Sequence, residues 1–232
     1  MPYTVGELLK HGVKQIIVVN DGSNEKCQYI FDKIETMPRC TVLTHRENRG
    51  KGRALKTAFQ YVLEHHSDLP GVVTADADGQ HAVEDVLKVG EALEEQKEAL
   101  VLGVRDFHSA GVPFRSILGN RSMSILFRLL FGTHLEDTQT GLRGIVMNHL
   151  KKMVYLKGER FEYEINMLVY AKVQGIPFLE VPIQTLYFDK NSGSHYKAII
   201  DSMKVFLRFI VGFFRSLSRK DVSFWEEKVE GK

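Results

Sequence analysis

The sequence has little of several features that would define a protein class by themselves. Its 232 residues include only two cysteines, Cys27 and Cys40, which are too few for a disulfide scaffold and lack metal-ligand spacing. A formal net charge of +2 gives no overall mark of a nucleic-acid binder. No signal peptide is visible, and no apolar run approaches the roughly 20 residues that cross a bilayer. We therefore expect a cytosolic globular chain with one main domain.

Short apolar runs alternate with segments of helical length in the first hundred residues. Strands are expected at 15–19, 41–44 and 99–103, and from Gly71 until Gly79 ends the strand, and helices at 5–11, 27–36, 53–64 and 81–97. This alternation favours an α/β fold with a parallel, doubly wound sheet. Ligands of such sheets bind beyond the carboxyl ends of the strands. Asp21, Asp76, Asp78 and Arg105 all follow strands at that edge, which makes it the expected site.

The second half of the chain changes character. Helices are expected at 119–131, 161–173 and 197–217, a polar loop at 137–144, and a strand at 176–187. Pro177 and Pro182 interrupt that strand, which predicts an edge strand or a bent one. No internal repeat or low-complexity segment is present.

The stretch from Gly71 to His81, G-V-V-T-A-D-A-D-G-Q-H, organises the site. Side chains two residues apart on a strand point to one side, so Asp76 and Asp78 are expected to point together. Paired carboxylates suit Mg²⁺ or Mn²⁺, and they leave positions open for water and a substrate diphosphate. Gln80 offers a third oxygen. The alternative is a polar turn after a core strand, without a ligand.

The loop N-R-G-K-G at 48–52 does not match two familiar phosphate motifs. It is not a Walker A loop, and Leu55 stands where the third glycine of a dinucleotide fingerprint belongs. A flexible cationic turn that leads into a helix N-terminus can still hold an anion. We therefore expect Gly50 and Lys51 to contact a phosphate, with a plain helix-start loop as the alternative.

Six motifs, taken in order, carry a resemblance to a known family. They read N-D-G-S, N-R-G-K-G-R-A-L, D-A-D-G-Q-H, G-V-R, D-T-Q-T-G-L-R and E-R-F-E-Y-E-I-N-M-L. Together they resemble the family 2 glycosyltransferases, and the dolichyl-phosphate mannose and polyprenyl-phosphate sugar synthases in particular. The resemblance implies a GT-A fold with a mostly parallel sheet, a divalent metal, a UDP- or GDP-sugar donor and inversion at the anomeric carbon. It covers residues 3–196, so we expect a GT-A domain at 1–196 and an amphipathic helix with a tail at 197–232.

The resemblance also implies roles for individual residues at the donor. Asp21 would contact the base or ribose of the nucleotide. Asp76, Asp78 and Gln80 would hold the metal against the diphosphate, where it neutralises charge on the leaving group.

On the acceptor side, Arg105 and Arg115 match arginines that face the acceptor phosphate in polyprenyl-phosphate enzymes. Asp137 matches an acidic position near the reaction centre that is often proposed as a base. A phosphate monoester has a second pKa near 6, so it is largely dianionic at pH 7 and needs no strong base. Such a nucleophile needs cationic clamping and alignment instead, which arginine forks provide. A plain surface charge is the alternative for Arg115.

Two departures from the family pattern stand out. The apolar first strand with an I-P-A-Y-N-E-like motif is absent before the helix that follows Met1, which predicts a central sheet position that is empty or refilled, with unpaired strand edges. Near residue 190, K-N-S-G-S-H replaces the usual R-x-x-G-x-S-K. Lys190 and His195 would then meet a phosphate, with His195 only partly charged at neutral pH.

The segment at 205–214, V-F-L-R-F-I-V-G-F-F, lies among lysines and arginines. It is too short to span a bilayer, but apolar and cationic residues together suit the membrane interface. We expect peripheral contact with the cytoplasmic face of a membrane, against the alternative of an ordinary helix packed on the sheet.

Four functions therefore stay open at this point. The leading one is metal-dependent transfer of a hexose to a polyprenyl phosphate. The others are transfer to a glycan or soluble acceptor, nucleotidyl transfer on a similar sheet, and an inactive fragment or regulatory binder.

Overall fold

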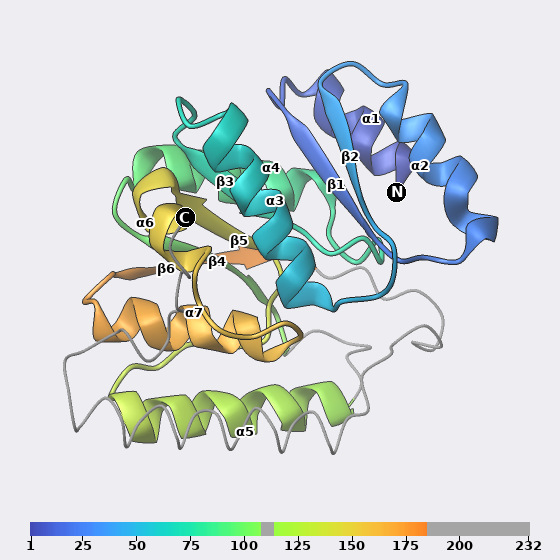
Figure 1. Cartoon of the computed structure of the whole chain (residues 1–232). Coiled ribbons are helices and arrows are strands. Elements are labelled where there is room, and N and C mark those ends of the chain that lie inside the picture. Colours follow the sequence, from blue (N-terminus) through green and yellow to red (C-terminus); the bar gives the residue numbers. More distant parts are fainter. Residues whose placement is uncertain (108–113, 185–232) are drawn as a thin grey trace.

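The computed structural model describes residues 1–107 and 114–184 (Figure 1). The helices are α1 (Pro2–Lys10), α2 (Gln28–Glu35), α3 (Lys51–His65), α4 (Val83–Glu95), α5 (Phe114–Phe131), α6 (Met147–Met153) and α7 (Glu162–Val173), with a 3-10 turn η1 (Glu25–Cys27). The strands are β1 (Ile16–Asp21), β2 (Cys40–His45), β3 (Gly71–Thr74), β4 (Leu100–Arg105), β5 (Arg143–Val146) and β6 (Phe178–Ile183). Strands and helices alternate through the first half, as the sequence predicts.

The strands form two sheets within the described residues. β1 and β2 pair in parallel, and the second sheet has the order β3-β5-β4-β6. β5 runs antiparallel to both of its neighbours, whereas β4 and β6 are parallel, so three of these four strands point the same way. Among the described strands, β1 and β3 each pair with one neighbour.

Three local features differ in how well the sequence predicts them. β6 lies at the edge of its sheet, which confirms the interpretation of Pro177 and Pro182. β5 and α6 were not predicted, because the polar motif at 137–144 conceals a strand of only four residues. The prediction that Asp76 and Asp78 share one side of a strand was wrong. β3 ends at Thr74, where its pairing with Arg143 ends, and both aspartates lie in the turn that follows.

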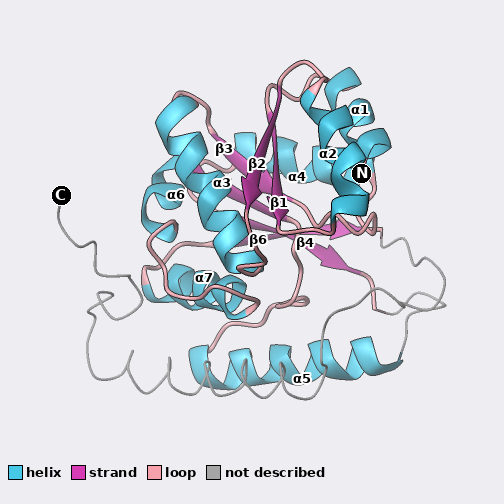
Figure 2. Ribbon diagram, turned by 45° about the vertical axis from the view of Figure 1, so that its right-hand side comes forward, coloured by secondary structure: helices cyan, strands magenta, loops and turns pink. Residues whose placement is uncertain are grey.

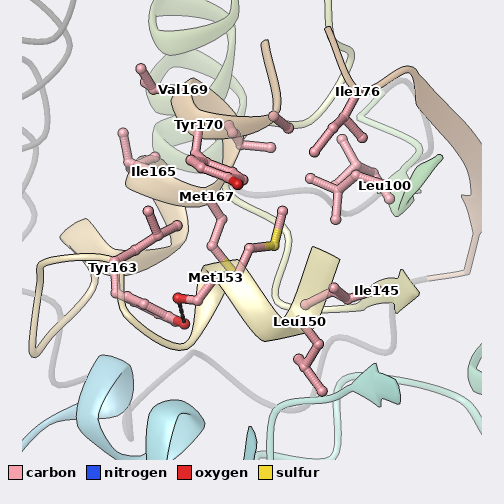
Figure 3. Close-up of a cluster of buried hydrophobic side chains, with 14 of the residues drawn as sticks. Leu100, Ile145, Leu150, Met153, Tyr163, Ile165, Met167, Val169, Tyr170 and Ile176 are labelled. Atoms are coloured by element: carbon pink, nitrogen blue, oxygen red, sulfur yellow. Dashed lines mark hydrogen bonds between the residues drawn. The ribbon is translucent and has the colours of Figure 1, made fainter. Parts of the chain in front are cut away.

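The main core surrounds α7, whose residues from Tyr163 to Ala171 are all buried (Figure 3). The Tyr163 hydroxyl donates a hydrogen bond to the Met153 carbonyl over 2.8 Å, which ties α7 to the end of α6. α3 approaches α7 closely at Gly52, because a Cβ there would lie 2.6 Å from Cβ of Tyr163. α7 is therefore a fixed support for the residues at its N-terminus.

α5 forms an outer layer, away from the strands in both views (Figure 2). Its inner side buries Met123 and Phe127, while Leu118, Ile125 and Leu129 are exposed. Across residues 1–107 and 114–184, no helix is both long and apolar enough to cross a membrane. The expected helix at 197–217 lies outside the described residues.

Candidate active site

The carboxylate of Asp21, at the end of β1, organises the loop that leads into α3. Its Oδ1 accepts a hydrogen bond from the backbone N–H of Arg49 over 2.9 Å, and its Oδ2 accepts one from Gly50 over 2.8 Å. His45 Nδ1 lies 2.7 Å from Oδ1, and because a carboxylate only accepts, His45 is the donor. Asp21, which the sequence predicts to contact the nucleotide, therefore also fixes the backbone of the loop before α3.

Electrostatics favour the charged form of this carboxylate. Partial burial by itself would raise the pKa of Asp21, but the hydrogen bonds from His45, Arg49 and Gly50 outweigh it and lower the pKa below the ordinary value. Asp21 consequently stays ionised in the folded protein at neutral pH.

The other side of the same loop packs against the turn before α7. Gly50 has φ of +102°, and a Cβ at this position would lie 2.5 Å from the carbonyl oxygen of Glu159. The Glu159 carboxylate accepts hydrogen bonds from Arg53 Nη2 over 2.6 Å and from Lys56 Nζ over 2.8 Å. These contacts fix the start of α3, and with it the position of Lys51.

Lys51 forms ion pairs with two carboxylates that are distant in sequence. Its Nζ lies 2.7 Å from Oδ1 of Asp76 and 2.9 Å from Oε2 of Glu164. Burial by itself would raise the pKa of Asp76, but Lys51 and nearby His81 hold it well below its usual range. For Lys51 burial acts to lower the pKa, and the attraction of Glu164 and Asp76 exceeds that effect and raises it. Lys51 and Asp76 are therefore both charged at neutral pH.

The two aspartates of the D-A-D motif have different surroundings. Asp78 is exposed, and its Oδ1 accepts a hydrogen bond from the backbone N–H of Gln80 over 2.9 Å. Within the described residues, no group of three or more histidine, cysteine, aspartate or glutamate side chains is arranged to hold a metal ion. The Lys51 ammonium, bound between Asp76 and Glu164, nevertheless marks a position where oxygen ligands already hold a cation. Such hard oxygen donors fit Mg²⁺ or Mn²⁺.

Asp137 and Arg105 form the second part of the site. Arg105 Nε lies 2.6 Å from Oδ2 of Asp137, and Nη2 lies 3.0 Å from Oδ1. The backbone N–H of Gln139 donates to Oδ1 over 3.0 Å, and the Asp137 side chain is fully buried. The structure thus joins two residues that the sequence predicts separately, and each oxygen of Asp137 already accepts a hydrogen bond.

The loop that carries Asp137 is held in place by α5 and β3. Asn120 donates to the Glu136 carbonyl over 2.6 Å and accepts from the backbone N–H of Thr138 over 3.2 Å. Thr74, the last residue of β3, donates to the Gly141 carbonyl over 2.8 Å. A Cβ at Gly141 would lie 2.3 Å from Oδ2 of Asp76. One loop therefore supports both the Asp137 carboxylate and the Asp76 carboxylate.

Arg143 lies fully buried behind both parts of the site. It donates to the backbone carbonyls of Thr140 over 2.9 Å and Glu164 over 2.6 Å. Burial lowers the pKa of its guanidinium, while the negative charges of Glu164, Asp137 and Asp76 act in the opposite direction. The Arg143 guanidinium therefore interacts electrostatically with carboxylates of both parts of the site.

Part of the predicted site lies outside the described residues. Residues 190 and 195, together with the Arg115 side chain, lie outside what is described, so the predictions for Lys190, His195 and Arg115 stay predictions. Three residues of the site were not predicted: His45, Glu164 and Arg143. Glu164 and Arg143 lie within two of the six family motifs, but nothing in their spacing shows that they face Lys51 or the buried carboxylates.

Comparisons with known proteins agree with this arrangement. The chain matches the model of "Glycosyl transferase family 2" over residues 4–157. It is 32% identical to an uncharacterized protein of Methanocaldococcus jannaschii, over 90% of this chain and 84% of that protein. It is 29% identical to UDP-N-acetylglucosamine–dolichyl-phosphate N-acetylglucosaminyltransferase of Methanococcus voltae, over 89% and 88% of the two chains. Polyprenol monophosphomannose synthase of Mycolicibacterium smegmatis is 26% identical, over 85% and 78%.

A solved structure shows the same fold. Glucosyl-3-phosphoglycerate synthase of Mycobacterium tuberculosis, in complex with Mn²⁺, uridine diphosphate and glucosyl-3-phosphoglycerate, matches with a TM-score of 0.60 and 14% identity, over 95% of this chain and 75% of that one. The likeness supports the GT-A fold, and the family model covers more than half of the sequence. The chain therefore belongs to glycosyl transferase family 2 and is a glycosyltransferase with a GT-A fold.

Proposed function

We propose that this chain transfers a hexose from a nucleoside-diphosphate sugar to the phosphate of a polyprenyl-type lipid, with inversion at the anomeric carbon. The names of the relatives from Methanococcus voltae and Mycolicibacterium smegmatis support a dolichyl or polyprenyl phosphate acceptor. The observation that carries the proposal is the state of Asp137, which is fully buried and accepts hydrogen bonds from Arg105 and Gln139.

This state bears directly on the acceptor. A sugar hydroxyl needs a base to remove its proton during attack. If Asp137 were that base, the proton would have to reach a buried carboxylate whose two oxygens already accept hydrogen bonds from Arg105 and Gln139. A lipid phosphate arrives largely ionised at pH 7 and requires orientation instead. Asp137 then acts by holding Arg105 in place, while Arg105, Arg115, Lys190 and His195 supply the positive charge that attracts the acceptor phosphate.

The donor half binds the nucleotide and its diphosphate. Asp21 contacts the nucleoside while it shapes the loop at 48–52, and Gly50 and Lys51 face the phosphates at the start of α3. Asp76, with Asp78 and Gln80 from the same turn, would hold Mg²⁺ or Mn²⁺, which when bound neutralises charge on the departing nucleoside diphosphate. The Mn²⁺ in the Mycobacterium tuberculosis enzyme is consistent with this metal requirement.

A lipid acceptor also calls for contact with a membrane surface. The basic and apolar residues of the 197–232 segment favour peripheral attachment at the cytoplasmic face. In this arrangement residues 1–196 carry the chemistry, and the segment that follows brings the site to the level of the lipid headgroups.

The proposal is tested by incubating the protein with radiolabelled UDP- and GDP-hexoses and a short-chain polyprenyl phosphate, with Mn²⁺ or Mg²⁺ and with a chelator. We expect label in the organic phase with at least one donor, and its loss when the metal is chelated. Transfer to a free glycan or a soluble acceptor, with none to the lipid phosphate, would overturn the proposed acceptor.

A further inference from the structure

The two carboxylates that form ion pairs with Lys51 lie in different surroundings: one is on a core helix and the other is in a turn. Glu164 lies in the first turn of α7, the helix at the centre of the core, and its side chain is 9% exposed. Asp76 lies in the turn after β3, and its side chain is 33% exposed. The ammonium group is therefore anchored on Glu164 and, through its second ion pair, sets the position of Asp76.

The Asp76 carboxylate is also confined on its other side. A Cβ at Gly141 would lie 2.3 Å from Oδ2, so the backbone of the 137–141 loop packs directly against that oxygen. Oδ1 faces Lys51 at 2.7 Å. A second cation that binds Asp76 through Oδ1 meets the positive charge of Lys51 at short range, where charges of like sign repel strongly.

We propose that Lys51 is a positioning residue that holds Asp76 ready, and that a divalent cation must compete with the Lys51 ammonium for this carboxylate. The inference rests on the proposed metal-dependent function and adds a role for Glu164. When the cation replaces Lys51 at Asp76, an exchange that breaks only the Lys51–Asp76 ion pair, the ammonium group keeps Glu164 as its negative partner. The N–H groups released from Asp76 are then available to a diphosphate, so cation binding and phosphate binding favour each other.

The first test measures Mn²⁺ affinity without nucleotide, from the relaxation rate of water protons, in the wild type and in Lys51→Met. Methionine keeps much of the length of the side chain and removes the charge. We expect Mn²⁺ to bind about tenfold more tightly to Lys51→Met, equivalent to about 1.4 kcal/mol. Lys51→Met leaves the carboxylates of Asp76 and Glu164 both without their shared lysine, and free to bind Mn²⁺ together. Adding Glu164→Gln removes one of these two carboxylates and should therefore reverse most of the gain in affinity.

Lys10→Met is the matched control. Lys10 lies on α1 and pairs with Glu7 at 2.7 Å, so its replacement also removes one lysine charge and one ion pair but leaves the contacts of Lys51 intact. Its Mn²⁺ affinity should equal that of the wild type. An unchanged or weaker affinity in Lys51→Met, or no Mn²⁺ binding to either protein across the millimolar range, would overturn the proposal.

A second measurement uses the unmutated protein and does not depend on the folding of Lys51→Met. Incorporation of ¹³C-labelled lysine leaves every ammonium group unaltered and makes the lysine side chains visible by NMR, and Lys51→Arg identifies the Lys51 signal by its absence. We expect this signal to shift as Mg²⁺ is added, while the signal of Lys10, identified in the same way, stays in place. A Lys51 signal that does not move at saturating Mg²⁺ would contradict the exchange. Neither measurement needs donor or acceptor, so failure of the exchange and failure of glycosyl transfer are separate outcomes.

Discussion

Arg105 and Asp137 form a two-pronged ion pair, with Nε 2.6 Å from Oδ2 and Nη2 3.0 Å from Oδ1. Arg105 is the last residue of β4, and Asp137 lies in the loop that precedes β5, so the pair closes the end of two neighbouring strands. Removal of Arg105 leaves the buried Asp137 carboxylate without its ion-pair partner, which costs much more than the loss of a surface pair.

We expect Asp137→Asn to lower the free energy of unfolding by about 3 kcal/mol, and Arg105→Met to have a similar effect. The double variant should lose less than the sum, with a coupling energy of about 1 to 3 kcal/mol from urea denaturation. Lys10→Met is the control, because it removes the exposed Lys10–Glu7 pair and should leave the urea midpoint unchanged. Additive effects of the two site variants would contradict the pairing.

Gly141→Ala tests the support behind Asp76. The added methyl group would lie 2.3 Å from Oδ2 and must displace a carboxylate that Lys51 holds from the other side. We expect kcat/KM for the donor to fall by about tenfold to a hundredfold, with a higher metal concentration needed for half-maximal activity. Gly119→Ala serves as the control, because nothing lies within 4 Å of a Cβ there. Equal kinetics in the two variants would show that Asp76 does not depend on this loop.

The lowered pKa of Asp21 makes the free energy of unfolding depend on pH in a specific way. Its pKa is lower in the folded protein than the value of about 3.9 in an unfolded chain. The carboxylate thus contributes stability that is fully present above the unfolded pKa and is lost as the pH falls through the folded pKa. We expect Asp21→Asn to cost about 1 to 2 kcal/mol at pH 7.

The difference between Asp21→Asn and the wild type should shrink at pH values below about 4. Chemical denaturation between pH 7 and pH 3 measures this change, with Asp32→Asn, at an exposed carboxylate bonded to Gln28, as the control. A difference that stays constant over this range would show that the Asp21 hydrogen bonds do not favour the charged form.

Much of the fold could be predicted because its elements have strong local patterns. The β-branched run at Ile16–Val19 identifies a strand from sequence alone, and the apolar residues of α3, which recur on one face, identify a helix. β5 could not be predicted in this way, because its four residues, R-G-I-V, contain an arginine and a glycine. It is stabilised by pairing with β3 and β4, which is a property of the whole sheet.

The same distinction applies to the site. The positions of Asp21, Asp76 and Arg105 after strands predicted a common edge, because strand ends converge in an α/β fold. The partners of these residues could not be predicted. His45, Lys51 and Asp137 reach them from other elements, across 24, 25 and 32 positions of sequence (45 − 21, 76 − 51 and 137 − 105). Pairings over such distances depend on how the elements pack.

The central claim is that the acceptor reaches the site already ionised, and a matched pair of lipids tests it most directly. Transfer should be measured to a short-chain polyprenyl phosphate and to the corresponding polyprenol, which differs only in lacking the phosphate. We predict product with the phosphate, none with the alcohol, and a rate that rises with pH through the second phosphate pKa near 6 in both the wild type and Asp137→Asn. Transfer to the alcohol, or a pH dependence that disappears in Asp137→Asn, would contradict the account and make Asp137 the base.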